Sequence, residues 1–145
     1  IGFVGYSGGE DSAGTDPEEA RRFAEATGVD AMAISVGNVH LQENKEGGLD
    51  LERIRAIERR TTIPLVIHGG SGVPVEQRRL LSHGSSICKF NIGTELRMAF
   101  GHALRAAVNS DPARFDRVTI LKDTHAPLVE ATRRVLEGFK GEAQC

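Results

Sequence analysis

Two histidines lie close to glycine and follow apolar runs. His40 ends the tetrapeptide 37–40, and His68 follows the apolar run 63–67. Neutral imidazole suits Zn²⁺, and a catalytic zinc commonly takes three protein ligands and leaves one position for substrate. His40 and His68 are therefore the candidate metal ligands, and a third ligand has to come from another part of the protein.

Two glycine-containing segments, 69–72 and 91–94, have the residues of a phosphate site. Glycine lets the backbone approach an anion closely, and the hydroxyls of Ser71 and Thr94 add donors. Each segment precedes a predicted helix, whose first amides are unpaired and whose dipole is positive at that end. Ordinary turns between a strand and a helix also use glycine for geometry, and this alternative stays open for either segment taken alone.

Three further side chains could move protons or form a covalent bond. Glu10 follows two glycines in a segment typical of a mobile loop, where an acid or base that closes over substrate is expected. Its neighbour Asp11 is the competing candidate, and a solvated loop carboxylate without a role is the alternative. Lys89 and Asn91 are two residues apart, so in a strand both side chains would point to the same face. A buried Lys89 of lowered pKa could form a Schiff base with a ketone.

Apolar runs and helix signals alternate along the chain. The predicted strands are 1–6, 29–36, 63–67 and 87–92, and the predicted helices begin near Pro17, Asp50, Pro74 and Thr94, with a short helix after Asp111-Pro112 and a terminal one over about 127–139. A helix between successive strands indicates right-handed βαβ crossovers and a parallel sheet. Four such units are half of a (β/α)₈ barrel of about 250 residues, and a free-standing doubly wound sheet is the alternative.

Apart from Lys89, the chemically useful residues lie at the ends of the predicted strands or in the segments that follow them. In a parallel α/β sheet the ligand meets the carboxyl ends of the strands, which lie at one edge. In a barrel, the phosphate site is frequently built from the loops after the last two strands. The position of segments 69–72 and 91–94 therefore favours the barrel over the free-standing sheet.

Composition excludes several classes of partner. The 145 residues carry a formal net charge of −2, which gives no basic field for nucleic acid or for an anionic membrane. No apolar run approaches the roughly 18 residues that a membrane span needs. The two cysteines, Cys88 and Cys145, match neither a disulfide framework nor a metal spacing, which favours a cytoplasmic location. Because the chain opens on Ile1 in a strand-like run, we expect it to be a piece of a longer protein.

Three segments, 37–40, 63–74 and 88–96, together resemble the class II, zinc-dependent ketose-bisphosphate aldolases, which include the fructose- and tagatose-bisphosphate enzymes. Further similarity at 15–20 and 28–30 extends the likeness from about residue 1 to residue 108. The resemblance implies an α/β fold, namely the C-terminal half of a single (β/α)₈ TIM barrel, entered at its fifth strand. Residues 1–145 would then be half of one domain.

The resemblance also implies roles for individual residues. His40 and His68 would bind Zn²⁺, and Glu10 would be the mobile-loop carboxylate. The third histidine ligand and an aspartate proton donor would lie outside this chain. A monovalent cation is a further candidate cofactor. The residues that would hold a dihydroxyacetone phosphate moiety are Leu41, Gly69, Gly70, Ser71, Asn91, Ile92, Gly93 and Thr94. Leu41 stands where the family commonly has glycine. Gly93 stands where the fructose-type branch has an acidic residue, which favours the tagatose-type branch.

The function implied is a lyase of carbohydrate metabolism such as glycolysis. It would reversibly cleave a ketose 1,6-bisphosphate to dihydroxyacetone phosphate and an aldehyde such as glyceraldehyde 3-phosphate. We expect a cytoplasmic homo-oligomer, a dimer or tetramer, with a sugar phosphate as partner and neither nucleic acid nor membrane, and we expect the isolated chain to be inactive. Two alternatives stay open, a Schiff-base aldolase that uses Lys89 and a sugar-phosphate-binding module without catalysis.

Overall fold

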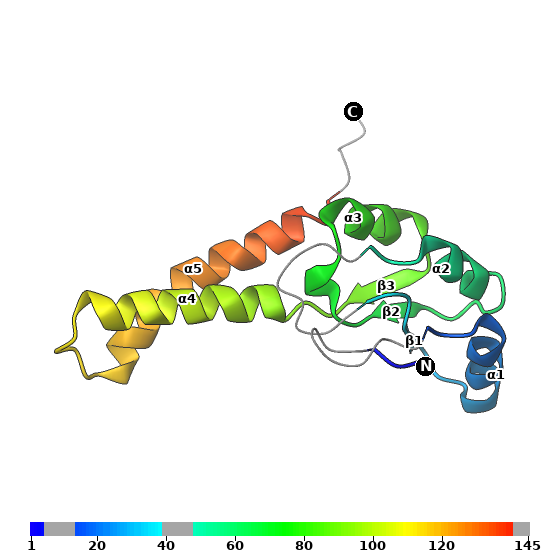
Figure 1. The fold of residues 1–145 in the computed structure, drawn as a ribbon, viewed down its shortest axis with the longest axis horizontal. Coiled ribbons are helices and arrows are strands. Elements are labelled where there is room, and N and C mark those ends of the chain that lie inside the picture. Colours follow the sequence, from blue (N-terminus) through cyan, green and yellow to red (C-terminus); the bar gives the residue numbers. More distant parts are fainter. Residues whose placement is uncertain (5–13, 39–47, 141–145) are drawn as a thin grey trace.

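The protein is described by a computed structural model that covers residues 1–4, 14–38 and 48–140. Its centre is a parallel sheet of three strands in the order β1, β2, β3 (Figure 1). The strands are β1 (Met32–Ile34), β2 (Leu65–Ile67) and β3 (Ile87–Phe90), and the helices are α1 (Pro17–Thr27), α2 (Leu51–Glu58), α3 (Val75–Gly84), α4 (Thr94–Ser110) and α5 (Arg117–Glu137). A single turn of 3₁₀ helix, η1 (Gly70–Gly72), follows β2.

Local capping explains where the first two helices begin. The Asp16 carboxylate accepts hydrogen bonds from the amides of Glu18 and Glu19, and Pro17 occupies the first helical position of α1. Asp50 caps α2 in the same way by accepting from the Arg53 amide at 2.9 Å. The predicted helix starts at Pro17 and after Asp50 are therefore confirmed.

One face of the sheet packs against the helices and forms the core. The core contains buried residues from all three strands and from the neighbouring helices, among them Met32, Ile34, Leu65, Ile67, Ile87, Ala20, Ile54, Ile57 and Leu81. Ala33 and Val66 lie between these residues on β1 and β2 and alternate to the other face, where they pair in register. A register shift between Leu65 and Val66 makes Lys89 of β3 the partner of Val66. The α/β class and the parallel sheet are confirmed, and closure into a barrel stays a prediction.

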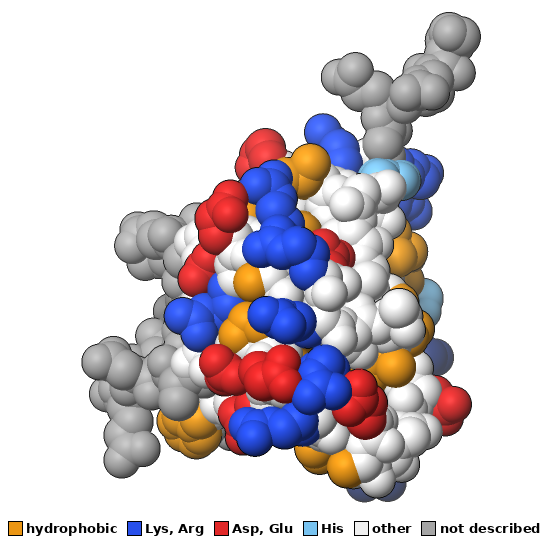
Figure 2. Space-filling model, turned by 90° about the vertical axis from the view of Figure 1, so that its right-hand side faces the viewer, with side chains coloured by type: hydrophobic (Ala, Val, Ile, Leu, Met, Phe, Trp, Pro, Cys, Tyr) orange, Lys and Arg blue, Asp and Glu red, His pale blue; other side chains and the backbone are white. Residues whose placement is uncertain are grey.

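The outer surface of α1 and α2 is charged with both signs. Arg21 bonds to Glu18 and Glu25, and Arg55 bonds to Glu52 at 2.9 Å. Figure 2 shows acidic and basic side chains interspersed over this end of the molecule. Exposed pairs of this kind contribute little to stability, about 0–1 kcal/mol each, so this face is a solvated exterior.

The first four residues do not form the predicted strand, although they lie beside β1. Instead of a ladder, the Ile1 nitrogen donates to the Ala33 carbonyl at 2.6 Å, and the Ser35 hydroxyl donates to the Phe3 carbonyl at 2.7 Å. Thr15, fully buried, completes the connection, because its hydroxyl accepts from the Ser35 amide at 2.8 Å and donates to the Ile1 carbonyl. A side chain therefore satisfies the backbone where a strand was expected, and positions 5 and 6 lie outside the described residues.

The last two helices form a hairpin that extends away from the sheet (Figure 1). The predicted short helix after Pro112 is wrong, because Asp111 makes a turn by accepting from the amides of Ala113 and Arg114. The terminal helix begins at Arg117 rather than near 127, since the Asp116 carboxylate caps it and Pro127 lies inside the helix. None of the helices in the described ranges combines the length and apolar character required to cross a membrane.

We predict that Thr15→Val lowers the free energy of unfolding by about 1–3 kcal/mol, because it leaves the buried Ser35 amide without an acceptor. Urea denaturation followed by circular dichroism measures the change. Thr15→Ser keeps the hydroxyl and is the matched control. Equal stability of the valine and serine variants would contradict the proposed bridge.

Candidate functional site

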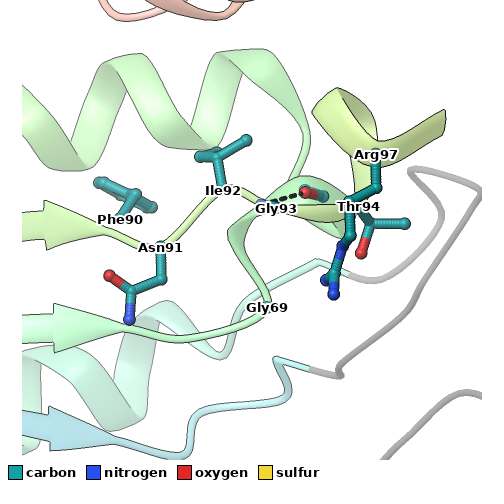
Figure 3. A pocket seen from close by; sticks show the side chains of 8 residues that line it. Gly69, Phe90, Asn91, Ile92, Gly93, Thr94 and Arg97 are labelled. Atoms are coloured by element: carbon teal, nitrogen blue, oxygen red, sulfur yellow. Dashed lines mark hydrogen bonds between the residues drawn. The ribbon is translucent and has the colours of Figure 1, made fainter. Parts of the chain in front are cut away.

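A cavity of about 460 Å³ lies beyond the carboxyl ends of β2 and β3 (Figure 3). It is lined by Gly69, Ser71, Phe90, Asn91, Ile92, Gly93, Thr94 and Arg97. The structure thus brings segments 69–72 and 91–94 together around one space, although they are separated along the chain by α3. The two segments meet because both strands run in the same direction and are hydrogen-bonded neighbours.

Backbone hydrogen bonds continue past the strand ends and shape the floor of this cavity. The Asn91 amide donates to the Ile67 carbonyl at 2.9 Å, and the Gly70 amide donates to the Asn91 carbonyl at 3.0 Å. Gly69 turns the chain with φ of 64°, a conformation that favours glycine. A Cβ on Gly70 would lie 3.2 Å from the Asn91 carbonyl oxygen. Gly70 is therefore required for the close approach and packs beneath the cavity rather than lining it.

Ser71 lines this cavity. Its Oγ accepts from the Gly93 amide at 3.2 Å and from the Glu95 amide at 3.3 Å, and the residue is only 4% exposed. A hydroxyl has two acceptor lone pairs and one donor hydrogen. Both lone pairs are thus taken by amides, and no described residue accepts the proton. The hydroxyl is a donor available to an anion.

The N-terminus of α4 forms the opposite wall. Gly93 precedes the helix and provides no side-chain cap, so the first turn relies on other groups to satisfy its amides. Thr94 lines the cavity at this end of the helix, where the dipole is positive. The combination of amides, two hydroxyls and a helix N-terminus suits an anionic ligand.

Arg97 adds a positive charge that the sequence analysis missed. It lies in the first turn of α4, and its side chain reaches back beside Thr94 and Gly93 (Figure 3). A Cβ on Gly93 would lie 3.1 Å from an Arg97 guanidinium nitrogen. The signal was available, because residues three apart on a helix share a face and Arg97 is three residues after Thr94. Phe90, the other lining residue that was missed, is the last residue of β3.

His68 lies at the carboxyl end of β2, next to Asn91. The Asn91 side-chain nitrogen is 3.3 Å from Nδ1 and 3.4 Å from Nε2 of the half-buried imidazole. The buried Asn38 side chain donates to the His68 carbonyl at 2.9 Å and accepts from the Val36 amide at 2.7 Å. Asn38 thereby joins the end of β1 to the end of β2 and holds the backbone of His68.

The metal prediction rests on His68 within the described structure. His40, Leu41, Glu10 and its competitor Asp11 lie outside the described residues. In residues 1–4, 14–38 and 48–140, no group of three or more His, Cys, Asp or Glu side chains could hold a metal ion. His68 could provide one imidazole, and a zinc site would need further ligands from elsewhere.

Lys89 is exposed in this structure and belongs to the sheet face that the helices do not cover. The Schiff-base alternative requires a buried lysine, because burial lowers the pKa of the amine. In the described part of the protein, Lys89 is exposed and therefore lacks the burial that this alternative requires.

Known structures share this fold. The chain is similar to the YdjI aldolase from Escherichia coli K12, with a TM-score of 0.66 and 26% identity over 91% of this chain and 46% of that one. The comparison with a candidate fructose-1,6-biphosphate aldolase from Coccidioides immitis gives a TM-score of 0.73 and 20% identity, over 95% of this chain and 50% of that one. The comparison with fructose-bisphosphate aldolase from Campylobacter jejuni gives a TM-score of 0.63 and 21% identity, over 87% of this chain and 45% of that one. The chain therefore spans about half the length of these proteins.

The sequence itself matches a family model over nearly its whole length. That model is described as fructose-bisphosphate aldolase class-II, and the match covers residues 1–144. Together with the shared fold, this match establishes that the chain belongs to the class II fructose-bisphosphate aldolase family.

Proposed function

We propose that this chain is the C-terminal half of an aldolase barrel whose complete form is a metal-dependent lyase. The reaction is the reversible cleavage of a ketose 1,6-bisphosphate, of the fructose or tagatose type, to dihydroxyacetone phosphate and an aldehyde such as glyceraldehyde 3-phosphate. Family membership over residues 1–144 supports the activity. The half-length match to solved aldolases supports the fragment.

The observation that carries the proposal is the cavity beyond β2 and β3. Its volume of about 460 Å³ is sufficient for a small phosphorylated ligand. Its wall combines the Ser71 hydroxyl, the Thr94 hydroxyl and the N-terminus of α4. Arg97 adds a guanidinium, a group that can form two parallel hydrogen bonds to a phosphate. The phosphate of the three-carbon product would bind here.

Phosphate binding in this cavity would place the reacting carbons near the end of β2. His68 lies there with its imidazole beside Asn91, and His40 is the second proposed ligand of Zn²⁺. Zinc, when bound, would supply a Lewis acid that polarises the carbonyl and hydroxyl oxygens of the substrate. The contribution of His68 depends on its orientation, which is supported by the Asn91 side-chain nitrogen and by the bond from Asn38 to the His68 carbonyl.

Cleavage requires two proton movements around one carbon–carbon bond. A base removes the proton of the C4 hydroxyl, the C3–C4 bond breaks, and the aldehyde leaves with its new carbonyl. The electron pair remains on C3 of the phosphorylated fragment, and an acid then protonates that carbon. Glu10 is proposed as one of these proton-transfer groups, and the other would lie outside this chain. Tight phosphate binding would keep C3 in place throughout.

We predict that chelation abolishes cleavage by the complete protein. The expected result is loss of ketose bisphosphate cleavage after treatment with EDTA and recovery on addition of zinc or cobalt. A coupled assay of dihydroxyacetone phosphate measures it. Activity that persists in metal-free protein would overturn the proposed mechanism.

Borohydride trapping separates the metal mechanism from the Schiff-base alternative. Reduction in the presence of substrate should leave the protein mass unchanged, because no imine forms in the proposed mechanism. Mass spectrometry of the intact protein provides the measurement, with Lys89→Met as the control variant. A reduced adduct that disappears in Lys89→Met would establish the alternative.

Arg97→Met should weaken phosphate binding. We expect the inhibition constant for inorganic phosphate to rise about tenfold, since one charge-assisted hydrogen bond contributes about 1.5 kcal/mol or more. Arg97→Lys keeps a charge and should retain part of the affinity. Arg105→Met, on the same helix but away from the cavity, is the matched control. An unchanged inhibition constant in Arg97→Met would exclude Arg97 from the phosphate site.

A further inference from the structure

Arg78 is a buried arginine on α3 that does not line this cavity. Only 1% of the residue is exposed, and one guanidinium nitrogen, Nη2, donates two bonds. One bond runs to the Ser71 carbonyl at 2.8 Å, and the other runs to the Glu95 carboxylate, whose side chain is 26% exposed. The arginine therefore connects the segment after β2 with the first turn of α4.

These bonds close a ring of contacts around Ser71. Arg78 holds the Ser71 carbonyl and the Glu95 carboxylate, while the Glu95 amide donates back to the Ser71 hydroxyl oxygen at 3.3 Å. The Gly93 amide donates to the same oxygen at 3.2 Å. Ser71 is thus held both by its backbone and by its side chain. With both lone pairs occupied, the direction of its hydroxyl proton is set by the position of α4.

The burial of the Arg78 charge indicates that this residue holds neighbouring groups in position. Burying a guanidinium costs free energy that an apolar side chain of the same volume would not lose. The Arg78 Nε is buried and has no acceptor in the described structure. Leu81, one turn further along α3, shows that an apolar residue suits this side of the helix. A stability role alone would favour a residue such as leucine or methionine at position 78.

We propose that Arg78 is a positioning residue for phosphate, acting through Ser71. Together with Glu95 it holds the Ser71 hydroxyl at the distance from α4 at which its proton points into the cavity. The inference rests on the proposed function only in taking phosphate as the ligand of that cavity. Arg78 itself does not touch the ligand.

The test measures phosphate affinity separately from stability. Inorganic phosphate is titrated calorimetrically into the complete protein and into Arg78→Met, and thermal unfolding is recorded for both. We expect the dissociation constant to rise about tenfold, the equivalent of one misaligned hydrogen bond to a charged group. The KM for a ketose bisphosphate should rise in parallel, with kcat changed much less. Arg78→Lys, which keeps one charged donor, should recover part of the affinity.

Two further variants keep the result decisive. Glu95→Gln retains the shape and the backbone amide but removes the charge partner, so it tests the ring if Arg78→Met does not fold. Arg79→Met changes the neighbouring arginine, which is not bonded to Ser71 or Glu95 in the described structure, and should bind phosphate normally. If folded Arg78→Met or Glu95→Gln binds phosphate with unchanged affinity, Arg78 has a structural role only.

The outcomes also distinguish this inference from the proposed function. A wild-type protein that binds phosphate but cleaves no ketose bisphosphate would overturn only the proposed reaction, and the affinity series would still decide the role of Arg78. A wild-type protein that does not bind phosphate would overturn the positioning role as well.

Discussion

The hydrogen bonds that join the end of β2 to the end of β3 determine where the polar groups of the cavity lie. The Asn91 amide bonds to the Ile67 carbonyl, and the Gly70 amide bonds to the Asn91 carbonyl. This continuation of the ladder places His68 beside Asn91 and brings the turn at Gly69 against the N-terminus of α4. Without it, the two glycine-containing segments would be separate loops on the surface of an α/β sheet.

Satisfying the polar groups at this edge uses a few side chains, each with more than one role. Asn38 satisfies the Val36 amide and the His68 carbonyl, and Ser71 satisfies the amides of Gly93 and Glu95. Buried polar groups are costly unless they are bonded, so each of these side chains offsets a cost that the open strand ends create. The same bonds occupy the acceptor sites of the Ser71 hydroxyl and leave its proton without an acceptor among the described residues.

Features set by neighbouring residues were predictable from the sequence, whereas features set by distant contacts were not. The starts of α1 and α2 follow from Asp16 and Asp50, because a cap acts within three residues. The segment 1–4 was assigned wrongly, since its apolar residues suit a strand but Thr15 competes for the partners on β1. The start of α5 was placed too late, because Pro127 lies inside a helix that Asp116 caps.

The grouping of Gly69, Ser71 and Asn91 to Thr94 was expected from parallel strands, while their roles, and the positions of Glu10, His40 and Leu41, remain predictions. Arg78 was missed because burial of a charged helix residue depends on tertiary packing.

Helix α3 contacts both sides of the strand-end region through adjacent residues. Arg78 holds Ser71, and the preceding residue, Gln77, accepts a bond from the Leu49 amide at 2.8 Å in the segment that leads into α2. The helix is therefore a mechanical link, and a displacement of α3 as a rigid body would move Ser71 and Leu49 together. A substitution that shifts α3 in the core, for instance at Leu81, would therefore alter the contacts of both segments at once.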